Sequence, residues 1–347
     1  MNKRSVILLI GILFFAGATS GAQVVPQENQ QPKPQTVKPQ DTDDEAGRVH
    51  IAECDDGFEI AIDGELFTRY LVTDEAKPML YPLYGPGQVP MTRNFPMDEV
   101  EGEQDDHPHH KSVWIGQLVN KHVDFWTNRS GVIQHAGVEL LEQADDTLVV
   151  NSNWLKRDDR TLVCKVQTTM RFGWDQNARW IDFTYVFDAC SGDLKFRDSK
   201  EGFFAIRSHP DLRLTPAPKK GVKKVFGQAI NSEGVKGKKI WGKAAKWVNY
   251  WGPVDGNVVG FAIFDHPENF RHPTIWHARD YGLVAANPFG LHDFTGAKKG
   301  TGDHTLPENE TITFRYRLLL HEGDHESANI EERYQACLLY TSPSPRD

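Results

Sequence analysis

The chain has 347 residues, of which 25% are charged, and a formal net charge of −9 when histidine is neutral. This acidic balance argues against nucleic acid or an anionic membrane as a partner, because both require a basic protein surface. Of the four cysteines, three lie before the last eleven residues, so the chain has at most one disulfide and one free thiol there. That number excludes a small disulfide-stapled fold.

The N-terminal segment has the pattern of an export signal. Asn2, Lys3 and Arg4 are followed by an apolar run over 6–16, and small residues lead up to Ala22. This pattern predicts a signal peptide over 1–22, cleaved near Ala22, and therefore a periplasmic or secreted protein. The apolar run is too short to span a membrane comfortably and no other stretch approaches its length, so we expect no integral membrane span in the mature chain.

Residues 23–47 are rich in Gln, Pro, Asp and Glu and poor in apolar residues, which predicts a disordered linker. From residue 49 onward, apolar and polar residues alternate in short segments that are separated by Gly, Pro and Asp turns. A period of two residues is typical of β-strands with one buried face. The predicted strands cover 49–53, 58–64, 137–142, 147–154, 161–170, 180–188, 258–264 and 311–320.

Helical periodicity is weak until 326–335. So many strands at short spacing predict an all-β fold, a large antiparallel β-sandwich with long functional loops. We find no repeat and no second linker, and expect one domain over 48–336. Residues 337–347 resemble a translated sequencing adapter, which predicts that they replace the true C-terminus after about Ala336.

The most informative motif is His107-Pro108-His109-His110, which follows Asp106 and places three imidazoles within four residues. Imidazole transfers protons near neutral pH and ligates transition metals. In an extended chain alternate residues share a face, so His107 and His109 are expected to converge on one ligand while His110 points elsewhere.

A second concentration of polar and aromatic residues lies in the loops between 231 and 290. Trp and Tyr faces stack on sugar rings, while Asn, Asp and Arg bind hydroxyl groups. The predicted substrate-binding residues are His110, Trp241, Lys243, Trp276, His277, Arg279, Asp280 and Asn287. For Arg279 and Asp280, a structural ion pair is an equal alternative.

Several motifs resemble an exported bacterial family that carries the label "methane oxygenase PmoA". They are Asp106 to Trp114, Val123 to Trp126, Asn231 to Gly234, Trp241 to Lys243 and Pro273 to Gly290. The resemblance runs from about Arg48 to Ala336. It implies a galactose-mutarotase-type β-supersandwich and, by analogy, carbohydrate chemistry.

The first functional hypothesis is an exported enzyme that isomerises or cleaves a sugar or sugar derivative by acid–base chemistry. His107 or His109 is the candidate acid, and Glu233, with Glu201 second, is the candidate base. The expected partner is a small-molecule or oligosaccharide substrate.

Two alternatives stay open at this stage. One is a metal enzyme with a divalent transition metal, in which His107 and His109 join a distant ligand such as His266, His272 or His277. The other is a non-catalytic carbohydrate-binding module, in which the tryptophans alone hold the sugar.

Overall fold

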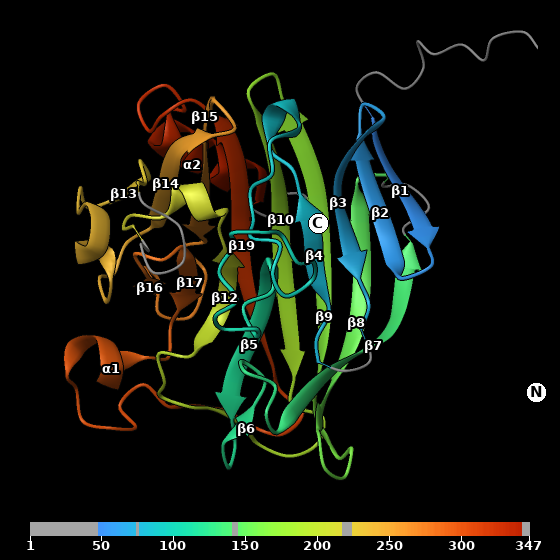
Figure 1. Cartoon of the computed structure of the whole chain (residues 1–347). Helices are drawn as coiled ribbons and strands as arrows, with labels where there is room; N and C mark the ends of the chain where they lie inside the picture. The colour runs from blue at the N-terminus through green and yellow to red at the C-terminus, as the bar shows by residue number, and fades with distance from the viewer. Residues whose placement is uncertain (1–47, 74–75, 141–144, 217–223, 342–347) are drawn as a thin grey trace, which may run out of the picture. The chain divides into compact units, whose positions relative to one another are not determined.

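The computed structural model describes residues 48–73, 76–140, 145–216 and 224–341 (Figure 1). The predicted signal peptide 1–22 and linker 23–47 lie outside these residues, as does 342–347. The assignment of 48–336 to a single domain therefore stays a prediction. No helix in the described part of the chain is long and apolar enough to span a membrane.

Within the described residues the strands form two sheets, and all the pairs between their strands are antiparallel. The first sheet has eleven strands, and its main path runs β1-β2-β3-β4-β5-β12-β17-β16. The strands on this path are β1 (Val49–Cys54), β2 (Gly57–Ile62), β3 (Glu65–Leu71), β4 (Met79–Leu83), β5 (Val113–Val119), β12 (Gly202–Arg207), β17 (Leu283–Asn287) and β16 (Ile275–Ala278). Three short strands lie off this path: β6 (Val123–Asp124) and β11 (Leu194–Phe196) pair with β5, and β18 (His304–Leu306) pairs with β11.

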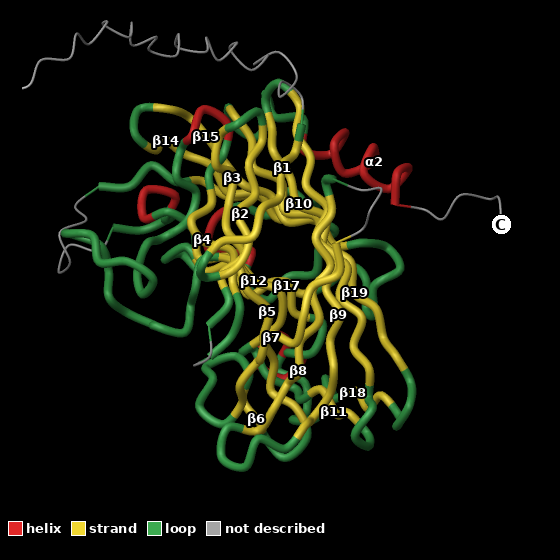
Figure 2. The backbone as a smooth tube through the Cα atoms, turned by 90° about the vertical axis from the view of Figure 1, so that its right-hand side faces the viewer, coloured by secondary structure: helices red, strands yellow, loops and turns green. Residues whose placement is uncertain are grey.

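The second sheet has eight strands in the order β13-β14-β15-β19-β10-β9-β8-β7. They are β13 (Gln228–Asn231), β14 (Trp247–Val254), β15 (Asn257–Asp265), β19 (Thr311–Glu322), β10 (Ala178–Asp188), β9 (Leu162–Asp175), β8 (Thr147–Lys156) and β7 (Gly131–Leu140). Figure 2 shows the strands in yellow and the longer loops in green, many of them beside β4.

The core lies between the two sheets and is rich in aromatic side chains. Phe204 of the first sheet stacks on Tyr316 of the second at 5.0 Å and contacts Phe183 at 4.8 Å between ring centroids. These rings belong to one continuous cluster of buried residues from both sheets. The predicted all-β, two-sheet antiparallel sandwich is therefore confirmed.

Two α-helices and three single 3-10 turns complete the described chain. The helices are α1 (Leu291–Thr295) and α2 (Ile330–Thr341), and the 3-10 turns are η2 (Pro86–Gln88), η3 (Pro210–Leu212) and η5 (Gly237–Ile240). The predicted helix 326–335 was placed too early, because 326–329 form a turn in which Asn329 has a φ of 49°. α2 packs Ile330 and Tyr334 against Phe264 and Leu319 of the second sheet.

The connection from β4 to β5, residues 84–112, is the long loop that matters for the site. It appears as the teal trace in Figure 1, in front of the first sheet. The face of that sheet away from the core carries a second small cluster, Trp114, Ala205, Leu283 and Ala285, which Trp126 covers. Both faces of β5, β12 and β17 are thus covered, one by the core between the sheets and the other by loops.

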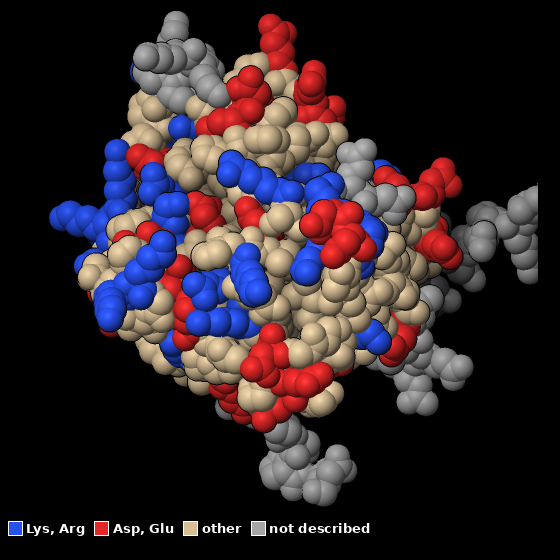
Figure 3. All heavy atoms as spheres, turned by 90° about the horizontal axis from the view of Figure 1, so that it is seen from below, with Lys and Arg blue, Asp and Glu red and all other residues tan. Residues whose placement is uncertain are grey.

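The surface charge is unevenly distributed. Seen from below, many Lys and Arg side chains gather at the left and across the middle of the face, with some Asp and Glu side chains among them (Figure 3). The net charge of −9 therefore does not describe every part of the surface.

Candidate active site

The histidine run forms a tight turn. The N–H of His110 donates to the carbonyl of His107 at 2.9 Å, and His107 has a φ of 48°. The expectation of an extended segment was wrong, because this backbone hydrogen bond and Pro108 at the next position close the chain into a turn. As a result His107 stacks on His110, with ring centroids 4.7 Å apart and planes at 5°, while His109 stands at 71° to His107.

A stack of aromatic rings fixes the histidines over the first sheet. His110 is buried and stacks on Trp114 of β5 at 5.4 Å, while His107 stacks on Tyr281 at 5.4 Å and 11°. Burial, together with the charges of His109, Arg207 and His107, holds the pKa of His110 far below its usual range. His110 is therefore a neutral, structural ring, whereas the side chain of His107 is 41% exposed.

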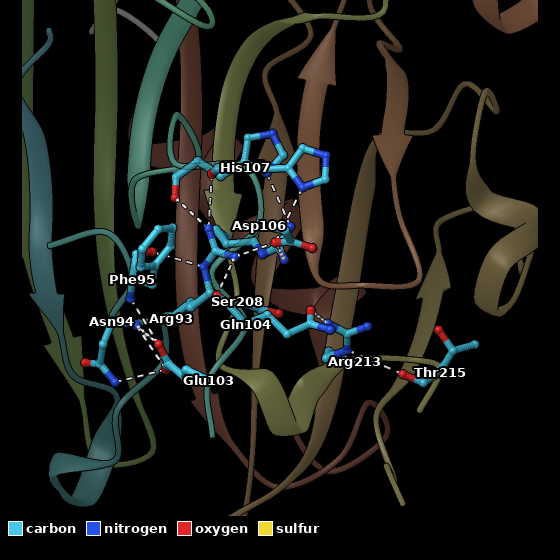
Figure 4. Close-up of polar contacts among 12 residues, drawn as sticks. Arg93, Asn94, Phe95, Glu103, Gln104, Asp106, His107, Ser208, Arg213 and Thr215 are labelled. Atoms are coloured by element: carbon cyan, nitrogen blue, oxygen red, sulfur yellow. Dashed lines mark hydrogen bonds and ion pairs between the residues drawn. The ribbon is translucent and has the colours of Figure 1, made fainter. Parts of the chain in front are cut away.

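Arg93 holds the loop together from inside. Its guanidinium donates to the carbonyls of Phe95 at 3.0 Å, His107 at 3.2 Å and His110 at 3.5 Å. It also donates to the Asp106 carboxylate at 2.7 Å. Figure 4 shows Arg93 in this central position. Because a buried guanidinium needs acceptors for its fixed fork of donors, these bonds specify the loop conformation.

Asp106 lies behind His107 and binds two buried arginines. Its Oδ1 accepts from Arg93 and, at 2.9 Å, from Arg207 of β12, and lies 3.4 Å from His107 Nδ1. Burial alone would raise the pKa of Asp106, but hydrogen bonds from His107 and Arg93 and the charge of Arg207 hold it well below its usual value. The carboxylate is thus ionised, and it orients the imidazole of His107.

Tyr281 connects the histidine side of the site with Glu201. Burial raises the pKa of Tyr281, the charges of Arg279 and Arg207 oppose this, and the charges of Glu201 and Asp106 add to it. Glu201 precedes β12, is 30% exposed, and accepts a short hydrogen bond from Lys200. His107 thus stacks on the tyrosine whose pKa the charge of Glu201 raises, although the two residues come from distant segments of the chain.

β16 and the residues after it supply two further predicted residues. His277 and Arg279 are two positions apart, and Arg279 lies 5.4 Å over the ring of Tyr281. Burial, then the charges of Lys200 and Arg279, lower the pKa of His277 to about 3. Its Nδ1 is buried without a hydrogen-bond partner among the described residues.

His109 lies beside this group and is half-buried. Burial, and then the charges of Lys77 and His107, lower the pKa of His109 to about 4, so it is neutral at pH 7. Between the two histidines predicted as acids, His107 is the more exposed and the one oriented by a carboxylate.

Other predicted substrate-binding residues have structural partners. Trp276 is fully buried in the core and donates to the carbonyl of Ala245, which removes its ring from any ligand. Asn287 is also buried, and its amide binds the backbone of the loops around 199–200 and 289–290. Trp241 is half-buried and packs edge-on against Phe294 at 5.4 Å.

The remaining predicted residues lie at the surface. Lys243 is exposed, and Glu233 lies in the exposed turn after β13, where it accepts from the Ser232 hydroxyl. No described hydrogen bond or ion pair joins Glu233 to the histidines. Asp280 pairs with Lys238 at 3.2 Å, so the structural Arg279–Asp280 ion pair is not observed. The predicted role of the two residues in binding hydroxyl groups stays a prediction.

The metal hypothesis finds no ligand set. Among the residues that the structure describes, no group of three or more His, Cys, Asp or Glu side chains is arranged to hold a metal ion. His107, His109 and His277 do not form such a group. His272 instead pairs with the buried carboxylate of Asp265 at 2.8 Å.

Three residues of the site were not predicted from the sequence. Arg93 and Arg207 are both buried, and Lys77 is fully buried with its ammonium nitrogen bonded to the carbonyl of Trp126 and 5.3 Å from the Trp114 ring. Arg207 did carry a signal, since it is the one charged residue in the apolar strand Gly202–Arg207. A charge at such a position requires a buried partner.

A protein-family model matches residues 57–335, most of the chain. The chain belongs to the family of unknown function DUF6807. The description of this family names no activity. No curated protein matches the sequence.

The solved structures that match this chain do so at low sequence identity and low TM-score. A galactose mutarotase-like protein from Clostridium acetobutylicum is 8% identical with a TM-score of 0.35, over 80% of this chain and 99% of that one. A putative aldose 1-epimerase from Escherichia coli K12 is 8% identical with a TM-score of 0.28, over 80% and 99%. A polysaccharide lyase is 9% identical with a TM-score of 0.32 over 84% of this chain, which spans about a third (34%) of the lyase. Such similarities do not transfer an activity.

Proposed function

We propose that this protein is an exported enzyme that isomerises or cleaves a sugar or sugar derivative by acid–base catalysis. His107 is the proposed proton-transferring group, Asp106 its positioning residue, and Glu201 the proposed second carboxylate. The observation that carries this proposal is the exposed imidazole of His107, held between the Asp106 carboxylate and the Tyr281 ring.

Proton transfer requires a group that a ligand can reach and whose orientation is fixed. Nδ1 of His107 faces Asp106, and Nε2 makes no hydrogen bond within the described chain. Nε2 is therefore the proposed atom that gives a proton to a substrate oxygen or takes one from it. The Asp106 carboxylate, held by two buried arginines, fixes the orientation of the His107 ring.

Glu201 is the better candidate for the opposite carboxylate than Glu233. Its charge acts on the Tyr281 hydroxyl, on whose ring His107 stacks, whereas the described hydrogen bond of the Glu233 carboxylate is with its neighbouring serine. An imidazole and a carboxylate beside one ligand position are what enolisation, elimination or glycosidic cleavage requires. Export rests on the sequence pattern of residues 1–22.

The test is turnover of a panel of sugars, sugar acids and keto-sugars, followed by proton NMR in water and in deuterium oxide. We expect His107→Gln and Glu201→Gln each to lower kcat by about a hundredfold or more, with unchanged thermal unfolding. His50→Gln is the control, because His50 is exposed on β1. A folded His107→Gln variant with wild-type kcat would contradict the proposal.

A further inference from the structure

The charges behind the candidate site are largely paired. The carboxylate of Asp106 faces two buried guanidinium groups, those of Arg93 and Arg207, and the charges of Glu103 and Asp105 also act on Arg93. Glu201 is matched by the ammonium of Lys200. Because these charges have partners, an unpaired cation beside them would attract an anionic ligand.

Arg279 is a cation of this site without a counter-charge among the described residues, and unlike the buried Lys77 it is partly exposed. It is half-buried, yet its guanidinium makes no hydrogen bond or ion pair with any described residue. Its contact is with the ring of Tyr281, 5.4 Å away. The neighbouring carboxylate of Asp280 pairs with Lys238 instead. A guanidinium in this position keeps its fork of N–H donors for a planar anion such as a carboxylate.

A second polar group near Arg279, the imidazole of His277, has one ring nitrogen without a partner. His277 is 3% exposed, and its Nδ1 makes no hydrogen bond among the described residues. It precedes Arg279 by two positions, and the charges of Arg279 and Lys200 both act on it. A buried ring nitrogen without a partner is uncommon, and a bound ligand or water would satisfy it.

We infer that the ligand of this site is a carboxylated sugar, a uronic acid or its oligomer, whose carboxylate binds the guanidinium of Arg279. The inference rests on the proposed function and adds the class of substrate. The ring that carries the carboxylate then lies beside Tyr281, within reach of both Arg279 and the imidazole of His107, which contact that tyrosine. In this arrangement Arg279 selects the substrate and His107 transfers the proton.

The test compares D-glucuronate and D-galacturonate with their methyl esters, which keep the shape and lose the charge. Binding is measured by calorimetry or ligand-observed NMR on the wild type, Arg279→Gln, Arg279→Lys and Lys239→Gln. Lys239 is exposed and supplies the control for removal of one positive charge.

We expect at least one uronate to bind about tenfold or more tightly than its ester, and Arg279→Gln to remove that difference. Arg279→Lys should retain part of it, and Lys239→Gln all of it. Equal binding of acid and ester, no binding of either uronate, or unchanged binding in Arg279→Gln would overturn the inference.

His107→Gln separates this inference from the proposed function. If uronate binding depends on Arg279 and His107→Gln abolishes turnover but not binding, both stand. If the binding depends on Arg279 but turnover ignores His107, the ligand class stands and the proposed mechanism fails. If a neutral sugar is turned over with His107 and Arg279 has no effect, the mechanism stands and the inference fails.

Discussion

Paired arginines on the outer faces of the two sheets differ in their surroundings. On the eight-stranded sheet, the Arg171 side chain is 62% exposed and binds Asp146 at 2.8 Å. On the eleven-stranded sheet, loops cover the face, and Arg207, 1% exposed, binds Asp106. An ion pair in water contributes little, whereas a buried charge is costly unless it is paired.

The eight-stranded face also has an open hollow of about 670 Å³, lined by Trp174, Trp180 and several arginines. Those arginines have carboxylate partners: Arg317 binds Asp182 and Arg333 binds Asp175, both at 2.6 Å. Arg279 on the other face has none. The candidate site therefore differs from the hollow on the eight-stranded sheet in having an arginine without a carboxylate partner.

We expect the largest change in the free energy of unfolding when a buried arginine is replaced, compared with an exposed arginine on the other sheet. Arg207→Met should lower the free energy of unfolding by about 3 kcal/mol, because it leaves Asp106 and His110 with fewer buried partners. Arg171→Met, the matched change on the open face, should cost less than about 1 kcal/mol. Urea unfolding of both variants measures the difference. Equal losses would show that the covered face does not bury charge as described.

The pH dependence of stability tests the buried histidines. The pKa of His277 is lowered to about 3 and that of His321, in β19, to about 4, in both cases mainly by burial. The unfolded chain therefore binds protons that the folded chain does not, and stability falls as pH drops below about 6.5. Between pH 6.5 and pH 5 each histidine should cost about 2 kcal/mol.

His277→Asn should remove its share of this loss on the site side, and His321→Asn the share in the eight-stranded sheet. The measurement is urea unfolding at pH 7 and pH 5. A pH dependence that neither substitution changes would mean that other groups cause it.

The smallest expected effect compares two glycines. A methyl group on Gly116 of β5 would lie 2.5 Å from the backbone oxygen of Phe125, and one on Gly173 of β9 would lie 2.5 Å from the ring of Trp180. The half-exposed Trp180 side chain can move away, but the backbone beneath the site cannot.

We expect Gly116→Ala to cost about 1 to 2 kcal/mol more than Gly173→Ala. Thermal unfolding of the two variants checks this order. The reverse order would mean that the segment around Phe125 adapts more readily than Trp180.

Patterns in the sequence were enough to predict the β-sandwich and most strands of the eight-stranded sheet. Over most of their length β9 and β10 alternate between more and less buried residues, so the two-residue period is visible in their sequence. β12 and β17 are buried on both faces and show no alternation, which explains why no pattern revealed them. The residues His107, Glu201 and Arg279 were also singled out from the sequence.

Which of the predicted site residues lie in contact depends on the tertiary structure and could not be predicted from the sequence. The loop 84–112 places His107 on Tyr281, a contact between residues 174 positions apart that no local pattern encodes. Folding also buried Trp276 in the core and left Glu233 at the surface, although both looked suitable in sequence. Residue type sets the chemistry that a side chain can perform, but burial and partners, which depend on distant segments, decide whether it can reach a ligand.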